Sequence, residues 1–123
     1  MNNKKEKRIA FFFVNLSGAG GERVIVDLAN EFSTRGNVVD MVLMQKKGAL
    51  ISSLSKNVNV INLESKTFVG AIFSLASYLR RYKPDSIMSI SPHTHIVSLM
   101  AKSLIFSIKT RIIFRVGISY TEM

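Results

Sequence analysis

The stretch RIAFFFVNLSGAGGERVIVDLANEFSTRG, residues 8–36, changes its hydrophobic period at a glycine-rich turn. Residues 8–14 are almost continuously apolar, as in a strand that is buried on both faces. That strand leads through the turn into a helix expected over residues 22–35, which Gly36 is placed to end. The helix is indicated by apolar residues at the spacing of one helical face: Ile25, Leu28, Ala29 and Phe32.

The same alternation of strand and helix patterns runs along the rest of the chain. It predicts a Rossmann-like α/β fold, a doubly wound parallel sheet with right-handed crossovers. Residues 1–7 read as a basic tail, and residues 8–123 as one domain, which we expect to be incomplete because no helix pattern follows the last strand. The further expected elements are strands at 38–44, 58–63, 85–91 and 111–116, a loop with a short helix at 48–56, and helices around 72–79 (stopped by Pro84) and 97–104.

The composition limits the class of protein. With 123 residues and 47% hydrophobic content, the chain suits one folded domain. The absence of cysteine excludes a disulfide framework, a thiolate metal site and a cysteine nucleophile. The apolar run at residues 9–14 is shorter than a secretion signal needs, and no apolar stretch reaches membrane-spanning length. We expect a cytoplasmic protein, with peripheral attachment to the inner face of the membrane as an open alternative.

The charge balance is strongly positive. Lys and Arg number 17 against 8 Asp and Glu, which gives a formal net charge of +9. This excess favours an anionic partner, either nucleic acid, a phosphorylated small molecule or an anionic membrane surface. Solvated helix ends and a tail that aids solubility are the alternative. A single-strand nucleic-acid groove interleaves aromatic with basic residues, but here Phe11, Phe12, Phe13, Phe32 and Phe114 occupy predicted core positions. No nucleic-acid partner is expected.

The glycine turn is the first candidate for a binding site. In a doubly wound sheet, ligands bind at the carboxyl ends of the strands, often at the first strand–helix turn. Glycines let backbone amides approach a phosphate or a sugar hydroxyl, although tight packing of the turn is the alternative. The turn does not fit the dinucleotide fingerprint, because Arg23 holds the place of the third glycine and Asp40 lies inside the second strand. The candidate contacts are Gly18, Gly20, Gly21 and Glu22.

Three stretches together resemble a known family. They are SGAGGERVIVDLANEFSTRGNVVDMV (17–42), KPDSIMSIS (83–91) and RIIFR (111–115). They are similar to the N-terminal domain of the GT-B glycosyltransferases called group 1, or family 4, with Leu28-Ala29 and Arg35-Gly36 at the family's positions. The resemblance implies an acceptor-binding domain whose partner is a second Rossmann domain, missing here, that grips the nucleotide-sugar donor. The chain alone is then expected to be inactive, and its parent to be a hexosyltransferase.

Three positions depart from the family pattern. Ala19 stands where the first glycine of the family's pair is usual, and Asn37 stands where a histidine is usual. Gly117 occupies the place after the fifth strand where many members carry a histidine near the sugar and acceptor. That departure puts acid–base chemistry at residue 117 in doubt, and no catalytic residue is assigned.

Further candidates follow the fourth and fifth strands. His93 could contact an acceptor hydroxyl or phosphate, or be an ordinary loop residue, and Thr94 is expected to cap the next helix. Arg115 could pair with an acceptor phosphate, or simply be a solvated strand end. His93 and His95 have no nearby Asp, Glu or Cys in sequence to complete a metal site, so no metal is expected.

Taken together, the sequence predicts the acceptor-binding part of a nucleotide-sugar-dependent glycosyltransferase for polysaccharide or glycolipid synthesis. Its expected partners are a sugar or lipid-linked sugar acceptor, an anionic membrane surface and the missing C-terminal domain. The donor sugar, the acceptor, the stereochemical course and the oligomeric state stay open. The alternative is a Rossmann-like module that binds a small molecule or phosphate without catalysis.

Overall fold

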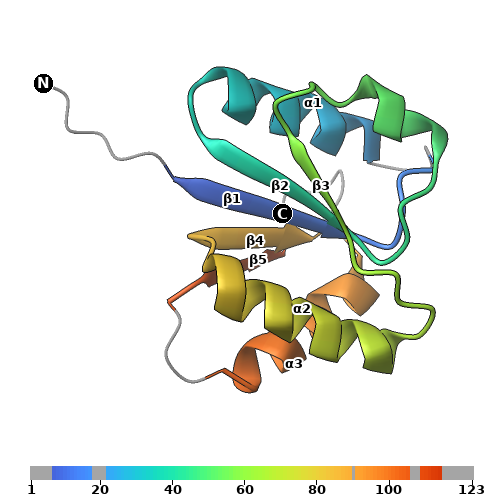
Figure 1. The fold of residues 1–123 in the computed structure, drawn as a ribbon, viewed down its shortest axis with the longest axis vertical. Helices are drawn as coiled ribbons and strands as arrows, with labels where there is room; N and C mark the ends of the chain where they lie inside the picture. The colour runs from blue at the N-terminus through green and yellow to red at the C-terminus, as the bar shows by residue number, and fades with distance from the viewer. Residues whose placement is uncertain (1–6, 18–21, 90, 106–108, 115–123) are drawn as a thin grey trace, which may run out of the picture.

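The computed structural model describes residues 7–17, 22–89, 91–105 and 109–114, and it shows an α/β fold with a five-stranded, all-parallel sheet (Figure 1). The strand order is β3-β2-β1-β4-β5, as in a Rossmann-like domain. The predicted fold class is confirmed. The elements are β1 (Arg8–Phe13), α1 (Glu22–Thr34), β2 (Val38–Leu43), η1 (Ala49–Ser53), β3 (Asn59–Asn62), α2 (Phe68–Tyr82), β4 (Ser86–Ser89), α3 (Pro92–Ser103) and β5 (Arg111–Phe114).

Helices cover the sheet on both faces, α1 on one and α2 with α3 on the other (Figure 1). The continuous apolar run of β1 is explained by this arrangement, since alternate side chains enter opposite cores. Phe11 and Phe13 pack on the α1 side with Ile25, whereas Ala10 and Phe12 pack on the α2–α3 side. All five residues are buried, so both cores meet along the central strand.

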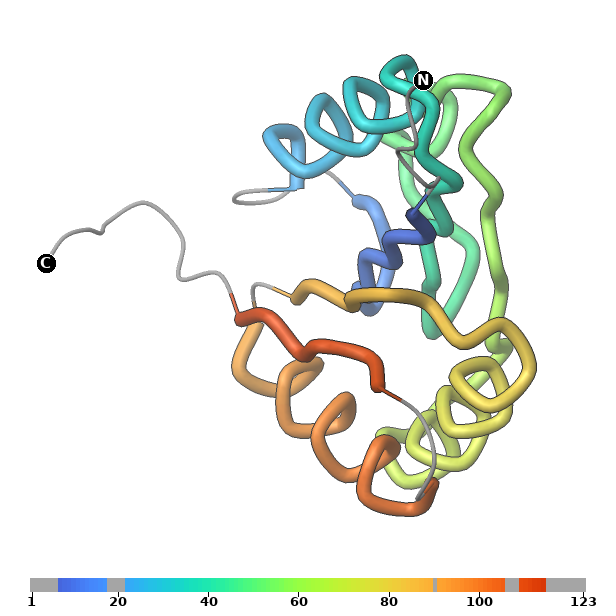
Figure 2. The backbone as a smooth tube through the Cα atoms, turned by 90° about the vertical axis from the view of Figure 1, so that its left-hand side faces the viewer, coloured from blue at the N-terminus to red at the C-terminus, as the bar shows by residue number. Residues whose placement is uncertain are grey.

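The connections reverse direction between β1 and β4. From β1 the chain runs outward through α1 to β2 and then β3, and α2 carries it back to β4 beside β1. From β4 it runs the other way through α3 to β5. Figure 2 shows that α1 and α3 both begin at the sheet edge where the strands end. The first turns of α1 and α3 therefore flank the topological switch point, where open α/β sheets bind ligands.

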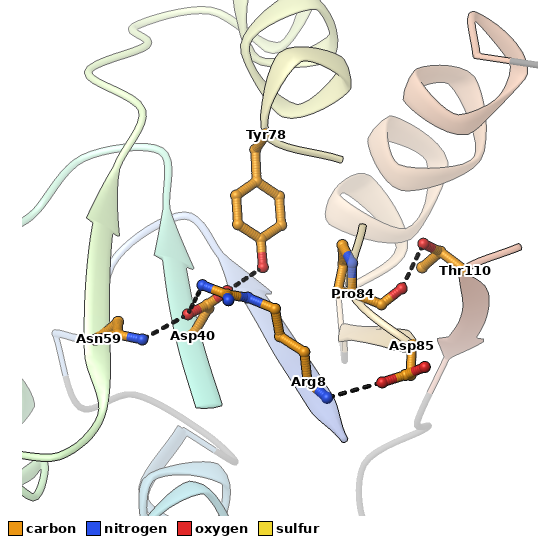
Figure 3. A network of polar contacts seen from close by, with 7 residues as sticks. All are labelled: Arg8, Asp40, Asn59, Tyr78, Pro84, Asp85 and Thr110. Atoms are coloured by element: carbon orange, nitrogen blue, oxygen red, sulfur yellow. Dashed lines mark hydrogen bonds and ion pairs between the residues drawn. The ribbon is translucent and has the colours of Figure 1, made fainter. Parts of the chain in front are cut away.

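A polar network closes the opposite, amino edge of the sheet (Figure 3). The buried carboxylate of Asp40 on β2 accepts hydrogen bonds from Arg8 Nε at 2.7 Å, Arg8 Nη2 at 3.1 Å, Asn59 Nδ2 at 2.9 Å and Tyr78 Oη at 2.5 Å. Asp85 adds a second link, because its carboxylate accepts from the Arg8 backbone N–H at 2.8 Å. Asp40 is thus a structural acid that joins β1, β2, β3 and α2.

Some sequence predictions need correction in detail. Phe114 was expected in the core, but it lies at the end of β5 with 36% of its surface exposed. This exposure follows because β5 is the last strand on that side of the described sheet. The Phe114 ring packs against the ring of His95. The first three strands also end one residue earlier than predicted, and β4 ends at Ser89 instead of residue 91. Among the described helices, none is long and apolar enough to cross a membrane.

Candidate functional site

The segment that leads from β1 to the glycine turn is fixed by the loop after β2. Leu16 donates its backbone N–H to the Lys47 carbonyl at 3.0 Å, and the Leu16 carbonyl accepts from the Leu50 N–H at 3.0 Å. Leu16 itself is fully buried. The Ser17 N–H is held by the Asn15 side chain at 3.1 Å. The backbone entering the turn is therefore preorganised, with its direction set by long-range contacts.

Gly48 makes this close approach possible. It has a φ of 123°, and a Cβ atom placed on it would lie 2.1 Å from both the carbonyl carbon and the oxygen of Leu16. That conformation and that distance both require glycine. The sequence placed Gly48 only at the start of a loop, and nothing local in the sequence reveals that Leu16 passes over it.

Helix α1 begins at Glu22, which places an acidic side chain in the first helical turn at the switch point. Glu22 is half-buried, and a carboxylate there interacts favourably with the helix dipole. The other predicted contacts of the turn, Gly18, Gly20 and Gly21, lie outside the described residues, as does Arg115. Of the predicted site residues, the structure therefore places Glu22 and His93.

Helix α3 begins on the other side of the switch point, and its start corrects two predictions. Ser91, not Thr94, is the N-cap: its hydroxyl accepts the His93 N–H at 3.2 Å, and Pro92 follows in the first turn. Thr94 lies within the helix, where its hydroxyl donates to the Ser91 carbonyl at 3.1 Å. His93 is consequently a helical residue and not part of a loop. The Ser-Pro pair at residues 91–92 was the sequence signal for this start.

The two histidines of the first α3 turn face different neighbours. His93 is exposed and stacks on Phe68 of α2, with ring centroids 5.4 Å apart. His95 stacks on Phe114 of β5 at 4.6 Å. The rings are therefore tied to opposite sides of α3 and do not converge on one ion. Within the described ranges, no group of three or more acidic or histidine side chains could hold a metal.

Two polar atoms that sequence reasoning did not single out lie near the carboxyl end of β4. The hydroxyl of Ser89 and Nδ1 of His95 are both buried, and within the described part of the chain neither has a hydrogen-bond partner. Ser89 ends β4 and pairs in register with Phe114, the residue on which His95 stacks. Buried polar groups are normally hydrogen-bonded, so these two atoms are exceptions among the described residues.

The two described residues with clearly shifted pKa values, Arg8 and Tyr78, lie at the amino edge of the sheet, away from this site. Burial raises the pKa of Tyr78 far above its ordinary value, and the hydrogen bond and charge of Asp40 raise it further. Burial alone lowers the pKa of Arg8, but the hydrogen bond and charge of Asp40 outweigh it and raise the pKa. Both pKa shifts therefore arise from the structural network around Asp40.

Comparison with known proteins places the fold. No model of a known protein family matches the sequence, and no curated protein matches it. The structure does resemble the crystal structure of a glycosyltransferase from Rickettsia africae ESF-5, with a TM-score of 0.71 at 16% sequence identity. The match covers 97% of this chain and 32% of that one, so the chain spans about a third of that protein's length. The fold is therefore a Rossmann-like α/β domain of a kind that this glycosyltransferase contains.

Proposed function

We propose that the chain is the acceptor-binding N-terminal part of a nucleotide-sugar-dependent glycosyltransferase. One observation carries this: nearly the whole chain superposes on one third of a glycosyltransferase, as expected for one domain of a larger enzyme. The motifs at residues 17–42, 83–91 and 111–115 favour the GT-B group 1 kind, acting in polysaccharide or glycolipid synthesis. In such an enzyme a second Rossmann domain binds the donor, so this chain alone is not expected to transfer sugar.

The proposed acceptor site is the switch point between β1 and β4. Glu22 in the first turn of α1 offers a carboxylate to sugar hydroxyls, and His93 in the first turn of α3 offers a ring nitrogen. The exposed, stacked rings of His93 and Phe68 add an apolar surface against which a sugar ring can lie. Gly18, Gly20, Gly21 and Arg115 remain predicted contacts of the same site.

The chemistry that the chain contributes is binding and orientation. Positioning one hydroxyl of an acceptor toward a donor accelerates transfer by making the reaction effectively unimolecular. No described side chain is assigned as a general base. The nucleotide-sugar donor is expected to bind only when the C-terminal domain is present, and no metal is part of the proposal.

The class of ligand can be tested by saturation-transfer NMR on the 123-residue chain. The probes are methyl glycosides of glucose, galactose and N-acetylglucosamine, with UDP-glucose and inorganic phosphate alongside. We expect saturation of at least one methyl glycoside, little transfer to UDP-glucose, and a weaker glycoside signal in His93→Ala. Thr34→Ala, at the far end of α1, is the matched control and should bind as the wild type does. Binding of UDP-glucose or phosphate without any glycoside would overturn the proposal and favour a non-catalytic phosphate-binding module.

A further inference from the structure

A cluster of exposed positive charge lies at the amino edge of the sheet, away from the candidate site. Helix α2 ends at this edge, and strands β1, β4 and β5 begin there (Figure 1). We call this cluster the basic edge, and its members are Lys7, Arg80, Arg81, Lys83, Lys109 and Arg111. In the loops after β2 and β3, at the carboxyl edge, the exposed charges are of both signs: Lys46, Lys47, Glu64 and Lys66.

The basic edge stands on one hydrogen-bonded frame (Figure 3). The Asp85 carboxylate accepts the Arg8 N–H, and the Asp85 N–H donates to the Arg8 carbonyl, both at 2.8 Å. The Asp85 carbonyl accepts the Arg111 N–H at 3.0 Å. The hydroxyl of the buried Thr110 donates to the Pro84 carbonyl at 2.6 Å. The starts of β1, β4 and β5 are therefore tied together, so the basic side chains on them keep a fixed spacing.

Two guanidinium groups at this edge share one aromatic ring. The Arg8 Cζ atom lies 4.7 Å from the centroid of the Tyr82 ring, and the Arg81 Cζ atom lies 5.8 Å from it. Tyr82 is 38% exposed, and its ring packs against that of Tyr78. Stacking on an aromatic face orients a guanidinium without engaging its N–H donors. The Arg81 donors can therefore bind an anion at little cost in side-chain entropy.

Helix ends alone do not account for these charges. Arg80 and Arg81 lie in the last turn of α2 and complement its dipole. Lys7, Lys109 and Arg111, however, lie outside the helices. Within the described ranges, neither ion pair of the structure involves a member of the basic edge. A fixed surface of one sign attracts a partner of the opposite sign, so the basic edge favours an anionic partner.

The size of the basic edge selects among anionic partners. Strands β1, β4 and β5 are neighbours in the sheet, so their starts span about 10 Å. Even a single DNA-binding module contacts its duplex over about 600 Å² or more, and a single nucleic-acid strand needs aromatic faces for its bases. The Tyr82 ring already carries two guanidinium groups. An extended peptide advances about 3.3 Å per residue, so a run of about four acidic residues matches this width.

We propose that the basic edge docks an extended acidic segment of a partner protein. The segment lies across the starts of β1, β4 and β5, beside the end of α2. Its carboxylates accept paired N–H groups from Arg81 and Arg111 and a single one from Lys83. This docking does not rest on the proposed function, because it uses the edge of the sheet opposite to the candidate site. A sugar and the acidic segment can therefore bind at the same time.

Fluorescence anisotropy of a labelled hexaglutamate peptide tests the docking. The 123-residue chain is titrated into the peptide at about 50 mM and at about 200 mM NaCl. We expect saturable, one-to-one binding that weakens at least about fivefold at the higher salt, because exposed charge pairs are screened. The double variants Arg81→Gln/Lys83→Gln and Lys109→Gln/Arg111→Gln should each weaken binding at least about fivefold, since each removes two of the proposed contacts.

The double variant Lys46→Gln/Lys47→Gln is the matched control, because it removes the same charge from exposed side chains at the carboxyl edge. It should bind the peptide within about twofold of the wild type, and circular dichroism confirms that each variant is folded. An equal loss in all three double variants would overturn the proposal, because binding would then follow net charge alone. Unchanged binding in both basic-edge variants would also overturn it.

Competition separates the acidic segment from other anionic partners. Single-stranded DNA and phosphatidylglycerol vesicles are added to the complex of chain and peptide, with the amounts compared by negative charge. Displacement of the peptide by either competitor at a lower charge concentration than unlabelled hexaglutamate would overturn the proposal. A methyl glycoside that binds the chain should keep its saturation-transfer signal when the peptide is present. Loss of that signal would contradict the placement of the acidic segment at the amino edge.

Discussion

Replacing Asp40 with alanine should destabilise the fold more than any other single loss of a polar side chain. The Asp40 carboxylate is fully buried and accepts four hydrogen bonds, from Arg8, Asn59 and Tyr78. Removing one partner of a buried ion pair costs about 3–5 kcal/mol, because the remaining charge loses its compensation. The Arg8 side chain is 28% exposed and can be partly rehydrated, so we expect about 3 kcal/mol. That is a large share of the roughly 5–15 kcal/mol typical of a domain.

The assay is urea unfolding followed by circular dichroism at 25 °C. Glu31→Ala is the matched control, because it removes an ion pair of similar length, 2.8 Å to Arg35, between side chains that are 68% and 54% exposed. That pair should contribute no more than about 0.5 kcal/mol. If Asp40→Ala prevents folding, Tyr78→Phe serves instead and should cost about 2 kcal/mol, since it removes one bond to a charged acceptor. Losses no larger than that of Glu31→Ala would refute the structural role of the network.

Three further predictions concern pH, a glycine and a helix cap. The pKa of Tyr78 is raised in the folded state, so the stability that this hydroxyl contributes is complete below the unfolded-state pKa of about 10 and is lost as the pH rises above 10. In urea titrations, the free energy of unfolding should therefore fall less steeply above about pH 10 in Tyr78→Phe than in the wild type. Gly48→Ala should cost about 2 kcal/mol or more, measured by the same titration, because its Cβ meets the Leu16 backbone at a positive φ; an unchanged stability would contradict that contact. Ser91→Ala should cost about 1 kcal/mol through loss of the α3 N-cap, whereas Thr94→Ala should leave the cap intact; equal stability of Ser91→Ala and wild type in thermal unfolding would disprove the assigned cap.

The sequence was sufficient for the order and type of the elements. The change of period around residues 15–22 and the later apolar runs are local signals, and each predicted strand and helix is present. The sequence also placed Asp40 inside the second strand, where the structure has it. What its partners are could not be predicted, because Arg8 and Tyr78 come from distant parts of the chain.

The candidate site was less predictable for the same reason. The sequence proposed Glu22 and His93 as candidate contacts, because both follow strand patterns at the carboxyl edge. It missed that His93 lies inside α3 and stacks on Phe68, since that contact depends on how α2 and α3 pack. The role of Gly48 and the unpartnered polar atoms of Ser89 and His95 likewise depend on tertiary contacts.

The central claim is that the switch point between β1 and β4 binds a sugar acceptor, and residue-level NMR tests it most directly. Amide shifts of the ¹⁵N-labelled chain are recorded while the glycoside that shows saturation transfer is added. The account predicts that the largest shifts fall on Ser17, Glu22, Ser91 and His93, with residues at the amino edge such as Asp85 unmoved. Shifts concentrated at the amino edge or on the outer side of α1, with the switch point unchanged, would contradict it.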